Sequence, residues 1–265
     1  MKFIVPIFAL ILIFSACQTK DKKQEKNENN IDTLTYAYDS VKVYSKNPPI
    51  KRDSISDTTY SSIVFPVFKN DSLNQYIKRQ VFNFFAQEEP VTSYQAIADS
   101  FIRGYDSFVN DNPDRPQAWY LAINIDVLKQ YKDYISLRYA HSDYAGGAHG
   151  NTSVSFLNYN PRTNTIITLD SLIQKGKMQE LTKLAETIFR KDEKLSANES
   201  LEGKYFFGNG KFALAQSFHV NDKGLVFLYN PYEIKAYVEG YTELVIPYSA
   251  LKHLAKPNSI LSIQH

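Results

Sequence analysis

Hydrophobic and polar residues alternate along much of the chain, with the period of two that is typical of β-strands. Thr33–Val43 is the first such segment, and Thr58–Phe68 is a second that Pro66 interrupts, which favours an edge position or a bulge. A longer block of alternating segments follows, separated by short polar turns. Its members are Trp119–Val127, Asp133–Tyr144, Thr152–Tyr159 and Thr165–Leu169. Strands joined this closely predict an antiparallel meander.

Two stretches with a helical period lie between the second and third of these strands. Asp71 or Ser72 is suited to cap a helix whose apolar face reaches Phe85. Ser93 is suited to cap a second helix, with aromatic residues recurring as far as Phe108. Short polar side chains at such positions accept the free N–H groups of the first helical turn. We expect the aromatic stripes of both helices to face the core.

The final third repeats the scheme on a smaller scale. Lys177–Leu195 has apolar residues at helical spacing, and Ser217–Val220 and Leu225–Tyr229 are joined as a tight hairpin. Pro231 stands where the first residue of a short helix over Tyr232–Tyr237 would lie. The whole pattern predicts an α+β fold of two small lobes, each an antiparallel sheet with helices packed on one face.

The N-terminal residues have the pattern of a secretory signal peptide. Lys2 precedes an apolar run that ends at Phe14, and two small residues stand before Cys17. The run is shorter than the roughly 20 apolar residues of a membrane span. The segment around Cys17 resembles a bacterial lipobox, although Phe14 stands where leucine is usual. We therefore expect residues 1–16 to be removed and Cys17 to carry the lipid. The alternatives are an ordinary signal peptide with an incidental cysteine and a chance apolar stretch.

The segment after Cys17 contains only polar and charged residues, so 17–30 is predicted to be a disordered tether. Two folded parts follow, and we predict their bounds as 31–162 and 163–265. Gln18, rather than Asp, follows the cysteine; by resemblance to the sorting rule of Gram-negative lipoproteins, this favours the outer membrane. We expect a lipid-anchored protein of the cell envelope, on the periplasmic or the surface face of that membrane.

Charge and composition remove several classes of function. The 30 Lys and Arg residues against 28 Asp and Glu residues give a net charge of +2, so no global basic field favours nucleic acid. The single cysteine excludes an internal disulfide framework and a Cys-rich metal site. We expect no cofactor.

Aromatic residues are abundant, with 19 Tyr and 17 Phe. Sheet cores favour both types, but glycan and peptidoglycan binders also present aromatic platforms. We expect some exposed members among six tyrosines. These are Tyr36, Tyr38, Tyr44, Tyr139, Tyr144 and Tyr241.

Two local motifs carry the candidate ligand-binding residues. A glycine-rich turn contains Gly146, Gly147 and His149, and a Tyr-Asn-Pro-Tyr-Glu motif contains Tyr232 and Glu233. His149 is suited to be a structural hydrogen-bonding residue, a ligand contact, a general base or, less simply, a metal ligand. No second His lies at metal-ligand spacing, and the chain lacks the local motifs of serine hydrolases, zinc peptidases and P-loop proteins. We assign no metal ligand and no catalytic residue.

Together, and in this order, the two motifs resemble a two-part extracytoplasmic module of bacterial envelope proteins, over roughly Asp57–Leu254. It pairs a domain like the N-terminal one of PdaC-type peptidoglycan deacetylases with the C-terminal domain of RsiV-type anti-sigma factors. In RsiV-type proteins the module binds lysozyme. The resemblance implies neither deacetylase activity, which belongs to a separate domain, nor an anti-sigma role, which needs a cytoplasmic segment.

These observations lead to three functional hypotheses. The first is a non-enzymatic envelope lipoprotein that binds a macromolecule, namely a glycan, peptidoglycan or a lysozyme-like protein. The second is a glycan- or cell-wall-directed hydrolase centred on His149, with Asp143 or Glu233 as the carboxylate. The third is a structural assembly lipoprotein without a small ligand.

Overall fold

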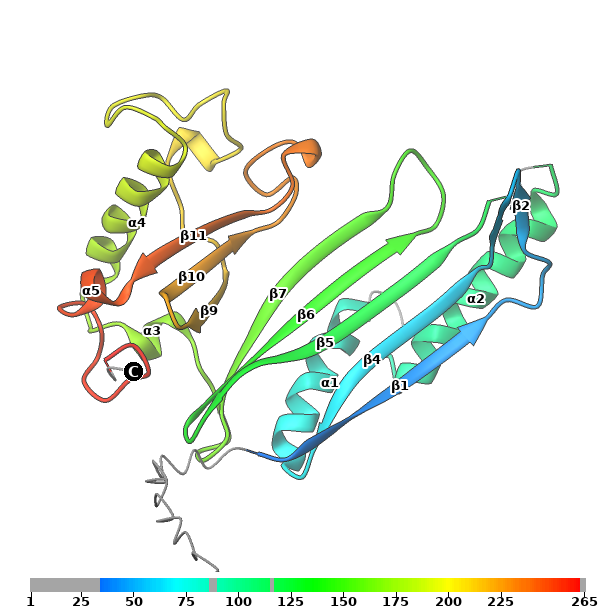
Figure 1. Cartoon of the computed structure of the whole chain (residues 1–265), viewed down its shortest axis with the longest axis horizontal. Coiled ribbons are helices and arrows are strands. Elements are labelled where there is room, and N and C mark those ends of the chain that lie inside the picture. The colour runs from blue at the N-terminus through cyan, green and yellow to red at the C-terminus, as the bar shows by residue number, and fades with distance from the viewer. Residues whose placement is uncertain (1–33, 86–89, 115–116, 263–265) are drawn as a thin grey trace, which may run out of the picture. The chain divides into compact units, whose positions relative to one another are not determined.

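The computed structural model describes residues 34–85, 90–114 and 117–262. The predicted signal peptide, tether and Cys17 lie outside the described residues. From Asp32 onward the chain forms one compact unit, which contains two lobes built on different sheets (Figure 1). The first lobe contains β1 (Tyr36–Tyr44), β2 (Ile50–Arg52), β3 (Ile55–Asp57), β4 (Tyr60–Phe68), α1 (Asp71–Phe85), α2 (Tyr94–Asp111), β5 (Tyr120–Tyr131), β6 (Tyr134–Tyr144), β7 (Asn151–Asn160) and β8 (Thr165–Ile166).

The first lobe is organised around a six-stranded sheet with the strand order β1-β4-β5-β6-β7-β8. Most neighbouring strands are antiparallel, as the meander predicts, but β4 and β5 pair in parallel. The prediction of a purely antiparallel sheet is wrong at this pair. Both helices lie between β4 and β5 in the sequence, and such a crossover brings the chain back in the same direction.

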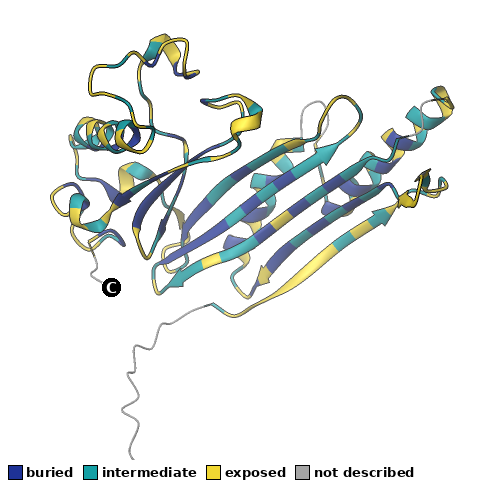
Figure 2. Cartoon of the chain, turned by 45° about the horizontal axis from the view of Figure 1, so that its top comes forward, coloured by how far each residue is buried: buried dark blue, intermediate teal, exposed yellow. Residues whose placement is uncertain are grey.

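Helices α1 and α2 cover one face of this sheet (Figure 1). Ile63, Leu121 and Ile123 of the central strands are fully buried against Leu73 of α1 and Ile97 of α2. Their neighbours in the sequence point to the opposite face, because side chains alternate along a strand. Figure 2 shows the buried central strands and the long exposed edge strand β1.

The caps of these helices differ in how well the sequence predicts them. The Ser93 hydroxyl accepts the Ala96 backbone N–H at 3.0 Å, which confirms Ser93 as the N-cap of α2. In α1, however, Asn70 Oδ1 accepts the Leu73 N–H at 3.0 Å, so Asn70 takes the role that we predicted for Asp71 or Ser72. All three residue types can cap, and the helix begins at Asp71, one residue earlier than a cap at Asp71 would give.

The second lobe is built on a three-stranded antiparallel sheet with the order β11-β10-β9. Leu181 and Phe189 of its longest helix pack with Leu225 and Phe227 of the central strand in a separate core. The α+β class, with helices on one face of each sheet, is thereby confirmed. The elements are α3 (Leu169–Leu172), α4 (Met178–Asp192), two 3-10 helices, η1 (Gly208–Gly210) and η2 (Tyr237–Glu239), β9 (Ser217–Asn221), β10 (Gly224–Tyr229), β11 (Thr242–Pro247) and α5 (Tyr248–Leu251).

The two lobes meet along β7 and β9 through side chains. Asn158 of β7 is buried, accepts the Tyr134 hydroxyl at 2.7 Å and donates to the Phe218 carbonyl at 2.7 Å. The Tyr134 hydroxyl in turn accepts the Val220 N–H at 2.9 Å. Buried polar groups that are satisfied in this way fix one arrangement, because any other leaves them unpaired. Tyr134 belongs to β6 of the first lobe but lies in the core of the second.

Candidate functional site

The glycine-rich motif forms the turn between β6 and β7. Gly146 and Gly147 have φ values of 96° and 102°, which side-chain-bearing residues rarely adopt. The Tyr144 hydroxyl lies 3.0 Å from the Gly147 carbonyl oxygen and 3.1 Å from Gln117 Oε1. The two glycines therefore shape the turn, and its side chains, above all His149, remain available for contacts.

His149 lies on the surface against two tyrosines of the second lobe. Its ring stacks on the Tyr237 ring at a centroid distance of 4.4 Å and an interplanar angle of 20°. Its Nε2 lies 3.4 Å from the Tyr232 hydroxyl, and its Nδ1 lies 2.9 Å from the Gly150 carbonyl oxygen. We call His149, Tyr232 and Tyr237 the aromatic cluster. The structure thus brings together two of the predicted residues, His149 and Tyr232, and adds Tyr237.

The Tyr-Asn-Pro-Tyr-Glu motif forms a turn rather than the short helix that we predicted over Tyr232–Tyr237. The Asn230 side chain accepts the Val154 N–H at 2.6 Å and donates to the Val154 carbonyl at 3.0 Å, which holds the turn on β7. The Glu233 carboxylate accepts the Asn230 N–H at 2.8 Å, and Tyr232 has a φ of 66°. These side-chain bonds replace helical ones. The Glu233 carboxylate therefore stabilises the turn, whereas Tyr232 is 57% exposed.

Gly150 connects the aromatic cluster with the sheet of the first lobe. A Cβ at this position would lie 2.7 Å from the Tyr120 hydroxyl and 2.8 Å from the Asp143 carbonyl oxygen, so no larger residue fits. The Gly150 carbonyl also accepts the Tyr237 hydroxyl at 3.1 Å. Tyr120 of β5 and Tyr237 therefore both lie against the same glycine.

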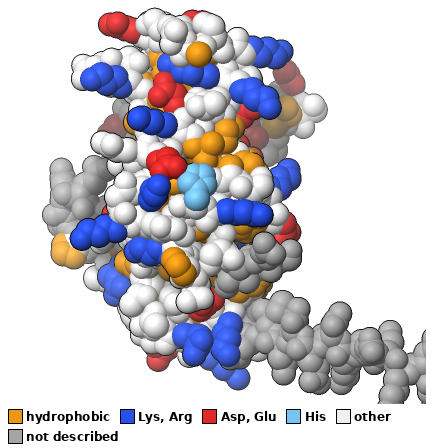
Figure 3. Space-filling view, turned by 90° about the vertical axis from the view of Figure 1, so that its left-hand side faces the viewer, with side chains coloured by type: hydrophobic (Ala, Val, Ile, Leu, Met, Phe, Trp, Pro, Cys, Tyr) orange, Lys and Arg blue, Asp and Glu red, His pale blue; other side chains and the backbone are white. Residues whose placement is uncertain are grey.

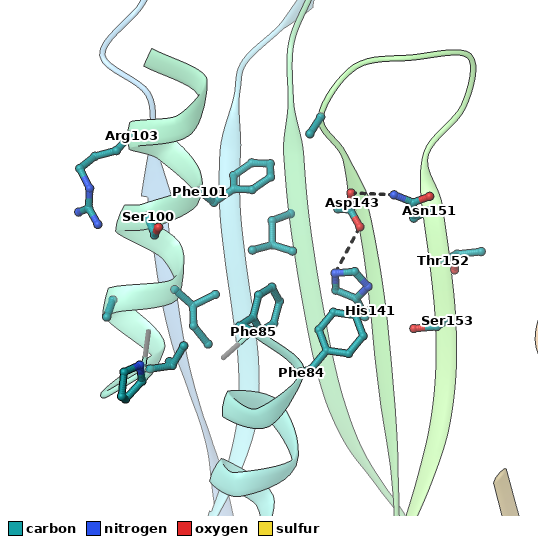
Figure 4. A pocket seen from close by; sticks show the side chains of 16 residues that line it. Phe84, Phe85, Ser100, Phe101, Arg103, His141, Asp143, Asn151, Thr152 and Ser153 are labelled. Atoms are coloured by element: carbon teal, nitrogen blue, oxygen red, sulfur yellow. Dashed lines mark hydrogen bonds and ion pairs between the residues drawn. The ribbon is translucent and has the colours of Figure 1, made fainter. Parts of the chain in front are cut away.

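The two carboxylates proposed as partners of His149 bond to other groups, Glu233 to the Asn230 N–H and Asp143 to side chains of its own sheet. Asp143 Oδ1 is 3.4 Å from Nε2 of His141, which is within ion-pair range, although the atoms do not align as a hydrogen bond. Asn151 donates to the other Asp143 oxygen at 3.2 Å. In Figure 4, dashed lines join His141 and Asn151 to Asp143. His141 and Asp143 are two residues apart on β6, a spacing from which this pair could have been predicted.

The His141–Asp143 pair lines a cavity of about 1110 Å³ on the helix-covered side of the first lobe (Figure 4). The ring centroid of His141 lies 4.8 Å from that of Phe84 and 5.8 Å from that of Phe85. Burial lowers the pKa of His141, and the nearby Asp143 carboxylate opposes this shift. The cavity thus combines aromatic walls with a buried imidazole beside a half-buried carboxylate.

The predicted exposed tyrosines fall into three groups. Tyr36, Tyr38, Tyr44 and Tyr241 are exposed. Tyr144 is half-buried, and Tyr139 is buried in the core of the first lobe. On β6, Tyr139 lies between the buried residues Leu137 and His141 on the same face of the strand, so its side chain is buried with theirs.

Charge is mixed on the face of the second lobe that Figure 3 shows, where basic and acidic side chains alternate around small hydrophobic spots. Among the described residues, no three His, Cys, Asp or Glu side chains are grouped as metal ligands. No helix in the described ranges combines the length and apolar character needed to cross a bilayer.

Comparison with known proteins places two family matches along the chain. Residues 52–152 match the family described as Deacetylase PdaC, and residues 170–249 match the protein of unknown function DUF3298. This confirms the predicted order of a PdaC-like segment and an RsiV-like segment. His149 falls within the first match, and Tyr232 and Tyr237 fall within the second. The boundary at residues 162 and 163 lies in the gap between the matches and stays a prediction.

Two crystal structures share the fold. A member of the DUF3298 family from Bacteroides fragilis NCTC 9343 is 23% identical, with a TM-score of 0.67, and the match covers 86% of this chain and 97% of that one. A DUF3298 family protein from Pseudomonas aeruginosa PAO1 is 18% identical, with a TM-score of 0.65 and the same coverage. No curated protein matches the sequence significantly.

Proposed function

We propose that this chain is a non-enzymatic lipoprotein of the cell envelope, anchored through Cys17, whose folded part binds a macromolecular ligand. The ligand is a glycan, peptidoglycan or a lysozyme-like protein. The lipobox-like segment, the polar tether and the resemblance of both lobes to extracytoplasmic modules support this proposal. The outer membrane is the proposed location.

One observation favours binding at the aromatic cluster over a purely structural role. The cluster is assembled from both matched segments, since His149 belongs to the first lobe and Tyr232 and Tyr237 belong to the second. Exposed aromatic side chains with polar tips supply large contact area at a low cost in conformational entropy. A ligand that touches all three side chains would also hold the two lobes together.

The anchor is tested by growing cells with a palmitate analogue and comparing the native chain with Cys17→Ser. We expect the native chain to be labelled and the variant to be unlabelled. A native chain that carries no label and retains Met1 would contradict the proposed anchor.

The binding role is tested by retention on immobilised hen lysozyme and on purified peptidoglycan sacculi. We expect wild type to be retained by at least one of them, and Tyr232→Ala/Tyr237→Ala to lose roughly tenfold in affinity for that ligand. Val238→Ala is the matched control, because this exposed residue lies beside Tyr237 but outside the cluster. Retention on neither material would count against the proposal.

A hydrolase is the second candidate, and the observation that favours it is the His141–Asp143 pair in the 1110 Å³ cavity. A neutral imidazole oriented by a carboxylate is the usual arrangement of a general base. Release of reducing ends from sacculi by wild type, abolished in His141→Ala, would establish this activity and displace the non-enzymatic proposal.

A further inference from the structure

Four tyrosines form a continuous row across the sheet of the first lobe. Tyr44 of β1 lies directly opposite Tyr60 of β4, Tyr60 opposite Tyr120 of β5, and Tyr120 opposite Tyr144 of β6. The successive ring centroids are 6.4, 6.3 and 6.4 Å apart. The last two pairs have nearly parallel rings, with interplanar angles of 22° and 25°. We call these residues the tyrosine row.

The tyrosine row lies on the face of the sheet that α1 and α2 leave uncovered. Leu121, the next residue after Tyr120, is buried in the core beneath the helices, so Tyr120 points the other way. Tyr44 is 51% exposed, and the other three rings are half-buried. Burial of a hydrophobic core therefore does not account for four aromatic side chains at these positions.

A cavity of about 790 Å³ is lined by all four tyrosines and by polar side chains around them. The polar set includes both donors and acceptors: Lys42, Ser56, Asp57, Thr58 and Gln117. Flat aromatic surface with a few polar groups at its edge is the usual make-up of a site for a small or chain-like ligand. One basic and one acidic residue give the cavity no dominant charge.

We infer that the tyrosine row is a platform for an elongated glycan, specifically the β-1,4-linked strand of peptidoglycan. This inference rests on the proposed binding function and names its ligand. Pyranose rings whose substituents are equatorial present C–H groups on both faces and hydroxyl groups at the rim. The faces pack on tyrosine rings, and the hydroxyls hydrogen-bond with the polar side chains of the cavity.

Other occupants fit the cavity less well. Nucleic-acid bases also stack on aromatic rings, but such grooves are strongly basic, and here Lys42 is balanced by Asp57. A peptide strand would add to the exposed backbone of β1 rather than to the face of the sheet. A lipid tail would leave the polar rim without partners.

The row also continues toward the aromatic cluster. The Tyr120 hydroxyl lies against Gly150, whose carbonyl accepts the Tyr237 hydroxyl at 3.1 Å. Tyr237 in turn stacks on His149. A chain-like ligand seated on the tyrosine row is therefore positioned to reach the aromatic cluster, whereas a single sugar would contact only part of this surface.

The experiment compares wild type with two matched double variants. Tyr44→Ala/Tyr60→Ala removes two rings of the row, and Tyr36→Ala/Tyr38→Ala removes two exposed tyrosines from the other end of β1. Binding is measured by co-sedimentation with sacculi and by calorimetric titration with chitohexaose, which has the same β-1,4 linkage. We expect the first variant to lose roughly tenfold or more in affinity for both materials and the second to bind like wild type.

Two further measurements separate ring stacking from loss of the fold. Thermal unfolding checks that each variant is folded, and Tyr44→Phe/Tyr60→Phe, which keeps both rings, should bind within about threefold of wild type. Saturation-transfer NMR with irradiation of aromatic protons should transfer most strongly to the axial C–H protons of the sugar. A phenylalanine variant as weak as the alanine variant would overturn the stacking model.

The outcomes also distinguish this inference from the proposed function. If sacculi bind wild type and the folded Tyr44→Ala/Tyr60→Ala variant equally, the tyrosine row is not the site, although the binding function stands. Retention on lysozyme with no binding to sacculi or chitohexaose would likewise overturn only the glycan platform. Failure of wild type to bind any of the three would remove both.

Discussion

His219 illustrates how a single residue couples pH to the junction between the lobes. It lies on β9 with its ring centroid 4.1 Å from that of Phe156 on β7, and its buried Nδ1 has no hydrogen-bond partner. Burial lowers the pKa of His219 from 6.5 to about 4. The folded protein therefore holds this imidazole neutral over a pH range in which the unfolded chain protonates it.

The sign of the pH effect follows from this difference. Between pH 6.5 and 4 the unfolded state binds the additional proton, so acidification lowers the free energy of unfolding, by up to about 3 kcal/mol for a shift of this size. Below pH 4 both states are protonated at His219 and its contribution levels off. His141, whose pKa burial also lowers, acts in the same direction.

We expect His219→Phe, which keeps an aromatic ring against Phe156, to reduce the loss of stability between pH 6.5 and 4. Urea denaturation at several pH values measures this loss of stability, with wild type as the reference. If His219→Phe is as acid-sensitive as wild type throughout this window, His219 does not carry the effect.

At the scale of single residues, the sequence predicted part of the aromatic cluster. His149 and Tyr232 were singled out from local motifs, and the structure brings them within 3.4 Å. Their contact with Tyr237 could not be predicted, because it depends on a turn that Asn230 anchors to a distant strand. The tyrosine row was missed for the same reason: cross-strand neighbours are set by register, which a single sequence does not reveal.

At the scale of the element, the Ser93 cap of α2 offers a direct test. We expect Ser93→Ala to lower the free energy of unfolding by about 1 kcal/mol, because it leaves the Ala96 N–H without its side-chain acceptor. Ser100→Ala is the control, since Ser100 is exposed within the same helix and should change stability by less than about 0.5 kcal/mol. Chemical denaturation measures both, and equal effects would argue against the cap.

Elements with strong periodicity were predictable, and those that depend on long-range contacts were not. The strands β5, β6 and β7 and the helices α1, α2 and α4 follow local alternation or helical spacing. The parallel pairing of β4 with β5 reflects the crossover through two helices, which a pattern of alternation cannot show. The segment after Pro231 has helix-like residues, but the Asn230 and Glu233 hydrogen bonds make it a turn.

At the scale of the whole molecule, the two lobes share buried groups. Tyr134 extends from β6 into the core of the second lobe, and Asn158 bonds to both Tyr134 and Phe218. A chain of this length is not expected to unfold in one step by size alone. Shared buried groups, however, couple the two lobes. If one lobe unfolds, the lobe that stays folded keeps a buried polar group without its partner, and this lowers its stability by about 1–3 kcal/mol.

We therefore expect Asn158→Ala to destabilise both lobes together, by about 2–3 kcal/mol, since it leaves the Phe218 carbonyl and the Tyr134 hydroxyl each short of a partner. Native-state hydrogen exchange measures this: the most protected amides of β5 in the first lobe and β10 in the second should lose the same free energy of protection. Asn151→Ala, at an exposed position of the same strand, should change neither by more than about 0.5 kcal/mol. Loss of protection confined to β10 would mean that the lobes unfold independently. In that case, a ligand that bridges the lobes would gain its affinity from the aromatic cluster rather than from a preformed junction.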